Sequence, residues 1–262
     1  LGCRHSQIES LLSFLDKIDP QELYIVGDFL EGWKATRLLR WNYDFNRVIN
    51  RLIDMANAGT MIFYTPGNHD AFLRTNPFLK QLIDQLDLCV LKDEFIYKMT
   101  DGRRFLVTHG DQFDSYESTN WLSYFVGEVI YQGLLWTNWF VHNMAKRNNR
   151  TPYNETGRLM RWIKRRFGFQ QDFESRVVGY ARENACEGII CGHIHAPVIC
   201  QREEIVFCNT GDWIENCTAL LEHSDGIIEL YYHYPAMRAS ELTSTLSAPQ
   251  ANLQAPVSER SA

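Results

Sequence analysis

Short apolar runs alternate with amphipathic stretches along most of the chain. Apolar residues at helical spacing from Ile8 to Ile18 predict a first helix, which opens with a capping box at 6–9 and closes before Pro20. The same spacing predicts further helices at 45–57 and 78–86. The apolar runs between them have the length of buried strands, at 23–26, 61–64, 104–108 and 188–191. Strands alternating with helices predict an α/β sandwich.

The last part of the chain has a different pattern. Three apolar runs, at 204–207, 218–222 and 227–234, follow one another without helical spacing between them, which predicts consecutive antiparallel strands. Residues 236–262 are rich in Ser, Thr, Ala, Pro and Gln and hold few large apolar side chains, so we expect a disordered tail there. The pattern predicts one domain over residues 1–235 and a tail behind it.

Composition narrows the class of protein. With 45% hydrophobic residues, 22% charged residues and a net charge of −6, the chain is neither disordered, nor collagen-like, nor a disulfide framework. Its seven cysteines are scattered and never spaced C-x-x-C, which indicates reduced thiols in a cytosolic protein. The most apolar long segment, 121–144, contains Glu128, Gln132 and His142 and is too polar to span a membrane.

Polar side chains follow four of the predicted strands. Taken singly, each has an ordinary interpretation as a turn, a loop cap or a satisfied histidine. Because the carboxyl ends of strands in an open α/β sheet meet at one edge, we expect these side chains to lie close together. A carboxylate, an amide oxygen and imidazoles suit manganese, iron or zinc, whereas structural zinc would need thiolates. The candidate metal ligands are Asp28, Asn68, His109, His193 and His195.

The same clusters match a known family. The motifs are G-D-x-x-E at 27–31, G-N-H-D at 67–70, H-G-D at 109–111 and G-H-I-H at 192–195. In this order and spacing the chain resembles the calcineurin-like metallophosphoesterases over about residues 1–234. Within that family it is similar to the group of UDP-2,3-diacylglucosamine diphosphatases of the lipid A pathway, with a further similarity at 209–213.

This resemblance implies a fold and a reaction. The fold would be a four-layer α/β/β/α sandwich with a helical cap inserted at about 115–180. The reaction would be metal-dependent hydrolysis of the pyrophosphate bond of UDP-2,3-diacylglucosamine, which yields lipid X and UMP. The cofactors would be two divalent ions, expected to be Mn²⁺ with iron or zinc as alternatives.

The resemblance also implies roles for single residues. Asp28 would bridge the two ions, Asn68, His109 and His193 would complete the shell of one, and His195 would bind the other. His69 would contact the scissile phosphate or act as a general acid, and Asp70 would orient it. Substrate contacts are expected at Arg74 and Asp111, and at Arg158, Arg161 and Lys164 in the inserted segment.

Two positions depart from the family pattern. The family's first strand ends in D-x-H followed by Leu-Gly, and those two polar residues hold the first metal. The printed sequence begins at this Leu-Gly, so we expect the motif to stand upstream in a longer protein. The best-known lipid A enzymes carry Arg at the position of His69, whereas the general family pattern has His.

The segment between the third and fourth motifs is longer than a strand connection needs. Its aromatic and aliphatic residues at 121–144 have helical spacing, which predicts either a helix packed on the core or a lid that receives acyl chains. Residues 146–166 carry eight basic side chains and one acidic. An aromatic segment next to a basic one suits binding of an anionic, acylated nucleotide sugar or of the surface of an anionic membrane. The alternative interpretation is that the basic residues form the solvated face of a helix.

Three functions therefore stay open. The first is hydrolysis of the acylated nucleotide sugar, by a cytoplasmic protein with a peripheral contact at the inner membrane surface. The second is hydrolysis of another substrate, such as a nucleotide, a phosphodiester or a phosphoprotein; a nucleic acid is disfavoured. The third is a non-catalytic remnant of the fold. No protein partner is implied.

Overall fold

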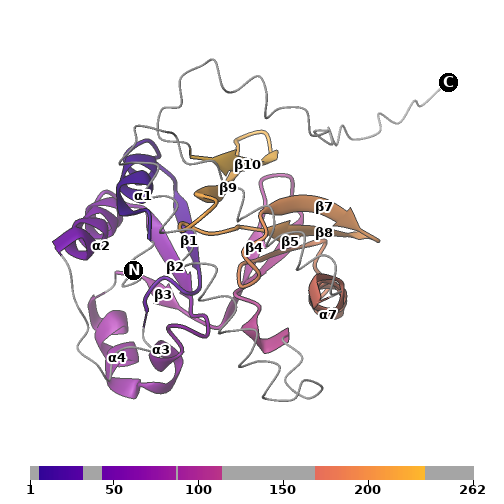
Figure 1. Cartoon of the computed structure of the whole chain (residues 1–262), viewed down its shortest axis with the longest axis horizontal. Helices are drawn as coiled ribbons and strands as arrows, with labels where there is room; N and C mark the ends of the chain where they lie inside the picture. Colours follow the sequence, from indigo (N-terminus) through magenta and orange to yellow (C-terminus); the bar gives the residue numbers. More distant parts are fainter. Residues whose placement is uncertain (1–5, 32–42, 87, 114–168, 234–262) are drawn as a thin grey trace, which may run out of the picture.

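The computed structural model describes residues 6–31, 43–86, 88–113 and 169–233 (Figure 1). Several predictions lie outside these residues: the helical segment at 121–144, the basic segment with Arg158, Arg161 and Lys164, and the tail at 236–262.

The first sheet is parallel and carries helices on its outer face. Its strands have the order β1-β2-β3, with β1 at Glu22–Val26, β2 at Met61–Thr65 and β3 at Val90–Leu91. Helices α1 (Ile8–Leu15) and α2 (Tyr43–Asn57) bury one aliphatic side against it, and α3 (Phe72–Thr75) and α4 (Pro77–Leu86) follow β2. This core contains Leu12, Phe14, Leu15, Val48, Leu52, Met55 and Ile62.

The second sheet is mixed and has the order β4-β5-β6-β8-β7. The central strands β5 (Arg104–Thr108), β6 (Gly188–Cys191) and β8 (Ile205–Asn209) run parallel. The edge strands β4 (Glu94–Lys98) and β7 (Val198–Arg202) are antiparallel to their neighbours. Helix α7 (Phe169–Glu183) covers the outer face and buries Phe173, Val177 and Ala181 against the sheet, so residues 169–180 of the expected cap lie in this helix.

Aromatic side chains fill the space between the two sheets. Tyr24 and Phe63 of the first sheet stack with their ring centroids 4.7 Å apart. From the second sheet, Phe95 meets Phe63 edge to face at 5.3 Å and Tyr97 meets Tyr24 at 5.3 Å. The order helix, sheet, sheet, helix is visible across Figure 1. The predicted α/β class is confirmed as a mixed α/β fold.

Two local predictions are wrong. Helix α1 has Gln7 at its N-cap without a side-chain cap hydrogen bond, so Ser6 and Glu9 form no capping box. The strand β8 does not open an antiparallel series, because it pairs in parallel with β6 and antiparallel with β7. Only β9 (Thr218–Glu222) and β10 (Ile228–Tyr232) form the expected antiparallel pair.

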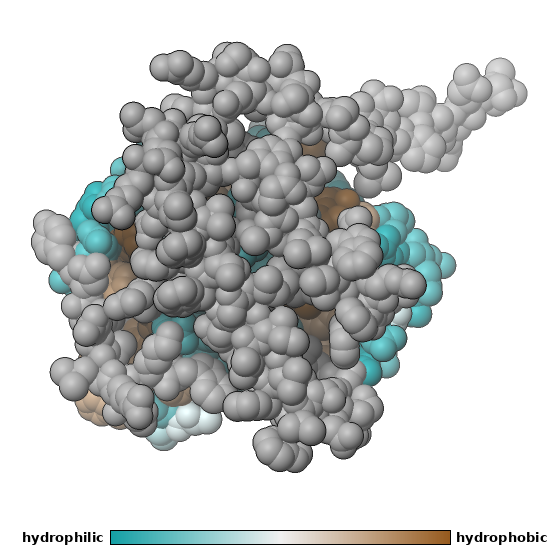
Figure 2. Space-filling model, in the orientation of Figure 1, coloured by the Kyte–Doolittle hydropathy of each residue, from teal (hydrophilic) through white to brown (hydrophobic). Residues whose placement is uncertain are grey.

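On the face that Figure 2 shows, the visible residues at the right-hand edge are mostly polar, and apolar residues lie further in. Larger exposed apolar side chains are scattered over several elements, and the most exposed is Phe78 of α4, at 70%. Among the helices described, none has the length and apolar character needed to cross a bilayer.

Candidate metal centre

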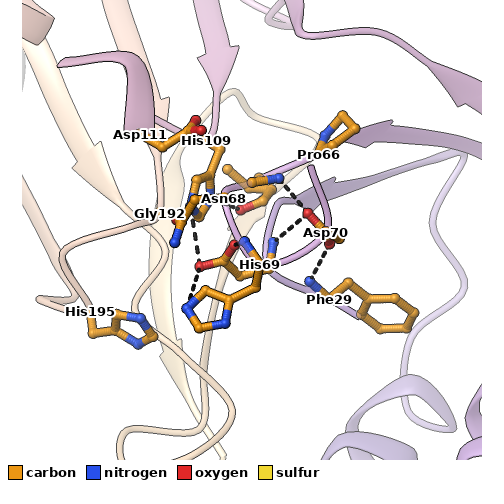
Figure 3. A network of polar contacts seen from close by, with 12 residues as sticks. Phe29, Pro66, Asn68, His69, Asp70, His109, Asp111, Gly192 and His195 are labelled. Carbon is orange, nitrogen blue, oxygen red and sulfur yellow. Dashed lines mark hydrogen bonds and ion pairs between the residues drawn. The ribbon is translucent and has the colours of Figure 1, made fainter. Parts of the chain in front are cut away.

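Loops that follow four strands converge at one edge of the sandwich (Figure 3). Asp28 follows β1, Asn68 follows β2, His109 follows β5, and His193 follows β6. The parallel strands of each sheet end at this edge, which is why residues so far apart in sequence come together there.

Three of the predicted ligands form a compact group. One ligand atom from each of Asp28, His109 and His193 lies within 4.8 Å of the others. The Asn68 amide oxygen lies 3.3 Å from His109 Nε2, and so does the Asp28 carboxylate. One carboxylate, one amide oxygen and two imidazoles fit a divalent ion such as Mn²⁺, iron or zinc. His195 stands apart from this group (Figure 3).

His109 is held in the orientation that metal binding through Nε2 needs. Its side chain is almost fully buried, and its Nδ1 lies 3.0 Å from the Val26 carbonyl oxygen. Because a carbonyl only accepts hydrogen bonds, Nδ1 carries a proton, and Nε2 is the atom that faces the oxygens of Asp28 and Asn68, where a proton or a metal ion can bind it. The fixed orientation comes from β1, the strand that also delivers Asp28.

Asp28 and His109 together stabilise positive charge at the site. Burial alone would raise the pKa of Asp28, but the hydrogen bond and charge of His109 hold it well below its usual range. Burial would lower the pKa of His109, and the Asp28 carboxylate raises it instead. The pair therefore favours a cation between its two side chains, where a metal would compete with a proton.

The motif glycines leave room for these side chains. A Cβ on Gly27 would lie 2.1 Å from His109 Nδ1, and a Cβ on Gly67 would lie 2.2 Å from an Asp28 oxygen. Gly27 also has φ +73°, a conformation that other residues adopt at a cost. Glycine is required at both positions because the ligands pack directly against the backbone.

Three of the candidate ligands have a strained backbone. Asp28, His193 and His195 have φ values of 53°, 60° and 53°, in the left-handed region that non-glycine residues rarely occupy. The Ile194 N–H donates to the Gly192 carbonyl at 2.7 Å, which closes a tight turn around His193. Such strain persists only where surrounding contacts enforce it, and it concentrates at functional sites.

Asp70 fastens the β1 loop to the β2 loop. Its fully buried carboxylate accepts the backbone N–H groups of 28–30, at 3.3, 2.8 and 3.2 Å, together with the N–H of Gly67 and the hydroxyl of Tyr64. The orientation of His69 by Asp70 stays a prediction; the hydrogen bonds of Asp70 hold the backbone of the two loops on either side of this site (Figure 3).

Glu31 lies beside His69 and was not among the predicted site residues. Its carboxylate is 3.1 Å from His69 Nδ1, while His69 Nε2 is 3.9 Å from Asp28. The hydrogen bond to Glu31 raises the pKa of His69 against the opposing effect of burial, and the charge of Asp28 adds to the rise. Glu31 is the acidic residue of G-D-x-x-E, so the motif itself was the signal that could have identified it.

The two predicted substrate residues that the structure describes pair with each other. Arg74 holds Asp111 through two hydrogen bonds of 2.7 and 3.0 Å, and it also donates to the Pro66 carbonyl. Its Nε lies 3.0 Å from Asp93. The ion pair ties helix α3, which follows β2, to the segment that follows β5.

Comparison with known proteins places the chain in a family. The sequence profile of the calcineurin-like phosphoesterases matches residues 1–197. The chain therefore belongs to the calcineurin-like phosphoesterase family, whose members are hydrolases that use divalent metals.

Individual relatives are distant. A UDP-2,3-diacylglucosamine hydrolase of Vibrio atlanticus (strain LGP32) is 23% identical over 236 residues, which cover 83% of this chain and 87% of the relative. An archaeal phosphodiesterase structure matches with a TM-score of 0.40 at 13% identity, covering 86% of this chain and 90% of the other. A Vps29 structure from Entamoeba histolytica matches with a TM-score of 0.40 at 11% identity, covering 88% and 92%.

Proposed function

We propose that this phosphoesterase hydrolyses the pyrophosphate bond of UDP-2,3-diacylglucosamine and releases UMP and lipid X. The observation that carries the hydrolytic part is the grouping of Asp28, Asn68, His109 and His193 from four separate loops. The name of the Vibrio atlanticus relative supports the choice of substrate. The aromatic and then basic sequence of 121–166 suits an acylated anion.

The ligand set would hold divalent metal. Asp28, Asn68, His109 and His193 would hold one ion, and Asp28 and His195 would contribute to a second. A divalent ion at this edge supplies Lewis-acid chemistry, because it withdraws charge from phosphate oxygens and makes water more acidic. Mn²⁺ is our first choice, since the donors mix oxygen and imidazole without thiolate.

His69 and Glu31 would act on the phosphate. Glu31 orients the ring through Nδ1 and leaves Nε2 on the side of Asp28. Its hydrogen bond also favours the protonated ring, and a protonated imidazole can donate to a phosphate oxygen or to the leaving group. Asp70 would act indirectly, because it fixes the backbone that carries Asp28.

A direct assay tests the substrate. The protein is incubated with Mn²⁺ and UDP-2,3-diacylglucosamine in detergent micelles, and UMP is measured. We expect release of UMP from the wild type and a loss of at least about 100-fold in Asp28→Asn, which removes the charged ligand. Asp225→Asn is the matched control, because Asp225 lies in the exposed turn between β9 and β10.

A second candidate substrate class has one observation in its favour. His69, paired with Glu31, follows the general family pattern and not the Arg of the best-known lipid A enzymes. A soluble diester such as bis(4-nitrophenyl) phosphate therefore belongs in the same assay. Fast hydrolysis of the diester without release of UMP would reject the lipid substrate and retain the phosphoesterase.

A further inference from the structure

Residues 209–216, at and after the end of β8, donate hydrogen bonds to the loop that carries His193 and His195. The buried side chain of Asn209 donates from Nδ2 to the Gly192 carbonyl, just before His193. Asn216 Nδ2 donates to the His195 carbonyl at 3.2 Å, on the other side of the loop. The Thr210 N–H donates to the Cys191 carbonyl at 2.9 Å. These contacts explain how the loop keeps two histidines at positive φ.

Asp212 lies at the centre of this segment and uses its two oxygens differently. Its Oδ1 accepts the backbone N–H groups of the residues that follow, Ile214 at 2.8 Å, Glu215 at 2.6 Å and Asn216 at 3.2 Å. Its Oδ2 lies 3.5 Å from His195 Nδ1 and accepts from Asn216 Nδ2 at 2.5 Å. One oxygen therefore caps a turn, and the other faces the histidine.

The second oxygen has a chemical consequence for His195. A carboxylate facing Nδ1 favours the tautomer with the proton on Nδ1, which leaves the lone pair on Nε2. A neutral imidazole binds metal through such a lone pair, and its other nitrogen commonly donates to a carboxylate. The Asp212 side chain is only 6% exposed, so water competes weakly for this contact.

We propose that Asp212 is a positioning residue that sets the tautomer and orientation of His195 for metal binding. The proposal rests on the proposed metal-dependent function and extends it to a residue outside the ligand set. The backbone N–H groups of the turn need only Oδ1, and Oδ2 also accepts from Asn216 Nδ2. The position of Oδ2 beside His195 Nδ1 is the observation that points to the second role.

Asp212→Asn tests this division. Asparagine keeps an oxygen for the three N–H groups but replaces Oδ2 with an NH₂ group, which donates and cannot accept from His195 or from Asn216 Nδ2. We expect a folded protein with an unchanged far-UV spectrum, a shift of His195 away from the Nδ1–H tautomer, and Mn²⁺ affinity about 10- to 100-fold lower at the site that His195 serves. Long-range ¹H–¹⁵N NMR of the metal-free protein reads the tautomer, and metal analysis after dialysis against limiting Mn²⁺ reads the affinity.

Asp225→Asn is the matched control. Asp225 Oδ1 caps the Ile227 N–H at 3.1 Å in the turn between β9 and β10, so the same atom exchange occurs away from the site. We expect this variant to match the wild type in both measurements. If Asp212→Asn also matches the wild type in both, Asp212 is a turn cap only and the proposal is wrong.

If Asp212→Asn fails to fold, the long-range ¹H–¹⁵N NMR spectrum of the wild type alone still tests the proposal. We expect the neutral His195 ring to carry its proton on Nδ1, and an Nε2–H tautomer would overturn the proposal without any variant. Failure of the proposed function has a different signature. In that case the metal-loaded wild type would hydrolyse neither the nucleotide sugar nor a soluble diester, while the tautomer and metal results would still report on Asp212.

Discussion

Two buried aspartates organise the two sides of the candidate metal centre in different ways. Asp70 collects donors from two separate loops, at 28–30 and at Gly67, and from the hydroxyl of Tyr64. Asp212 collects its backbone donors from three of the four residues that follow it, and its other oxygen accepts from Asn216 Nδ2 and faces His195. Asp70 thus joins distant parts of the chain, whereas Asp212 closes a local turn and reaches one ligand.

The difference matters because a buried carboxylate is tolerated only when donors surround it. Removing the charge of Asp70 leaves donors in two loops without their acceptor, and those loops carry Asp28 and Asn68. Removing the charge of Asp212 leaves the three backbone N–H groups capped and changes the contacts of Oδ2 with His195 and Asn216. The same residue type therefore contributes mainly to folding on one side and mainly to ligand geometry on the other.

The largest effect is expected from Asp70→Asn. Its NH₂ group would face N–H donors in a fully buried position, so we expect the free energy of unfolding to fall by about 3 kcal/mol or more. Asp212→Asn should lose only about 1 kcal/mol. Urea unfolding of both variants measures the difference, with Asp225→Asn as the reference. Equal losses for Asp70→Asn and Asp212→Asn would contradict the division of roles.

Gly67→Ala should disturb the ligands that Asp70 holds in place. The new Cβ would lie 2.2 Å from Asp28 Oδ1 and 2.7 Å from His109 Nε2, so both side chains must move. We expect Mn²⁺ affinity, measured by calorimetry, to fall at least about 10-fold. Gly179→Ala in α7 is the control, because its Cβ meets no atom within 4 Å and alanine favours a helix. Unchanged affinity in Gly67→Ala would mean that the ligands do not pack against the glycine.

Replacing His193 separates backbone strain from ligand loss on the Asp212 side. His193 has φ 60°, which glycine adopts freely and alanine does not. We expect His193→Gly to be about 1 kcal/mol more stable than His193→Ala, although both lose the same ligand. Thermal unfolding of the pair measures this gap. A more stable alanine variant would show that the loop relaxes out of the left-handed conformation.

The smallest expected effect concerns how the free energy of unfolding depends on pH. Burial, and to a lesser extent the charge of Lys17, lowers the pKa of His233, which follows β10 and packs near Phe14 and Trp213. The unfolded chain then binds a proton that the folded chain resists, so stability should fall as the pH drops below about 6.5. We expect His233→Phe to flatten this slope in urea unfolding, whereas His223→Gln on the exposed β9–β10 turn should retain it. An unchanged slope in His233→Phe would assign the pH dependence to other groups.

Features of the fold and the site that a short stretch of sequence encodes could be predicted from the sequence alone. A short apolar run followed at once by a polar motif identifies a strand end, and for this reason the group of Asp28, Asn68, His109 and His193 was foreseen. Helices α2 and α4 begin within two residues of their predicted starts and end where predicted, because each has one aliphatic face.

Features that depend on pairing between distant segments were not foreseen. The contacts of Glu31 with His69 and of Asp212 with His195 join different loops, and no local pattern states which carboxylate meets which ring. The edge strand β4 has only three apolar residues in a row between two charged ends, and only Phe95 among them is buried, so its pattern is weaker than that of the central strands. The donors of Asp70 were not foreseen for the same reason, since three of them come from a loop about 40 residues away.

Calorimetric titration of Mn²⁺ into the metal-free protein tests the central claim most directly. Asp28→Asn is the variant to compare, because asparagine tolerates φ 53° and keeps the shape of the side chain while losing its charge. We expect the wild type to bind Mn²⁺ and Asp28→Asn to bind it at least about 10-fold more weakly, with an unchanged far-UV spectrum. Equal Mn²⁺ affinity in the two proteins would contradict a metal centre built on Asp28, Asn68, His109 and His193.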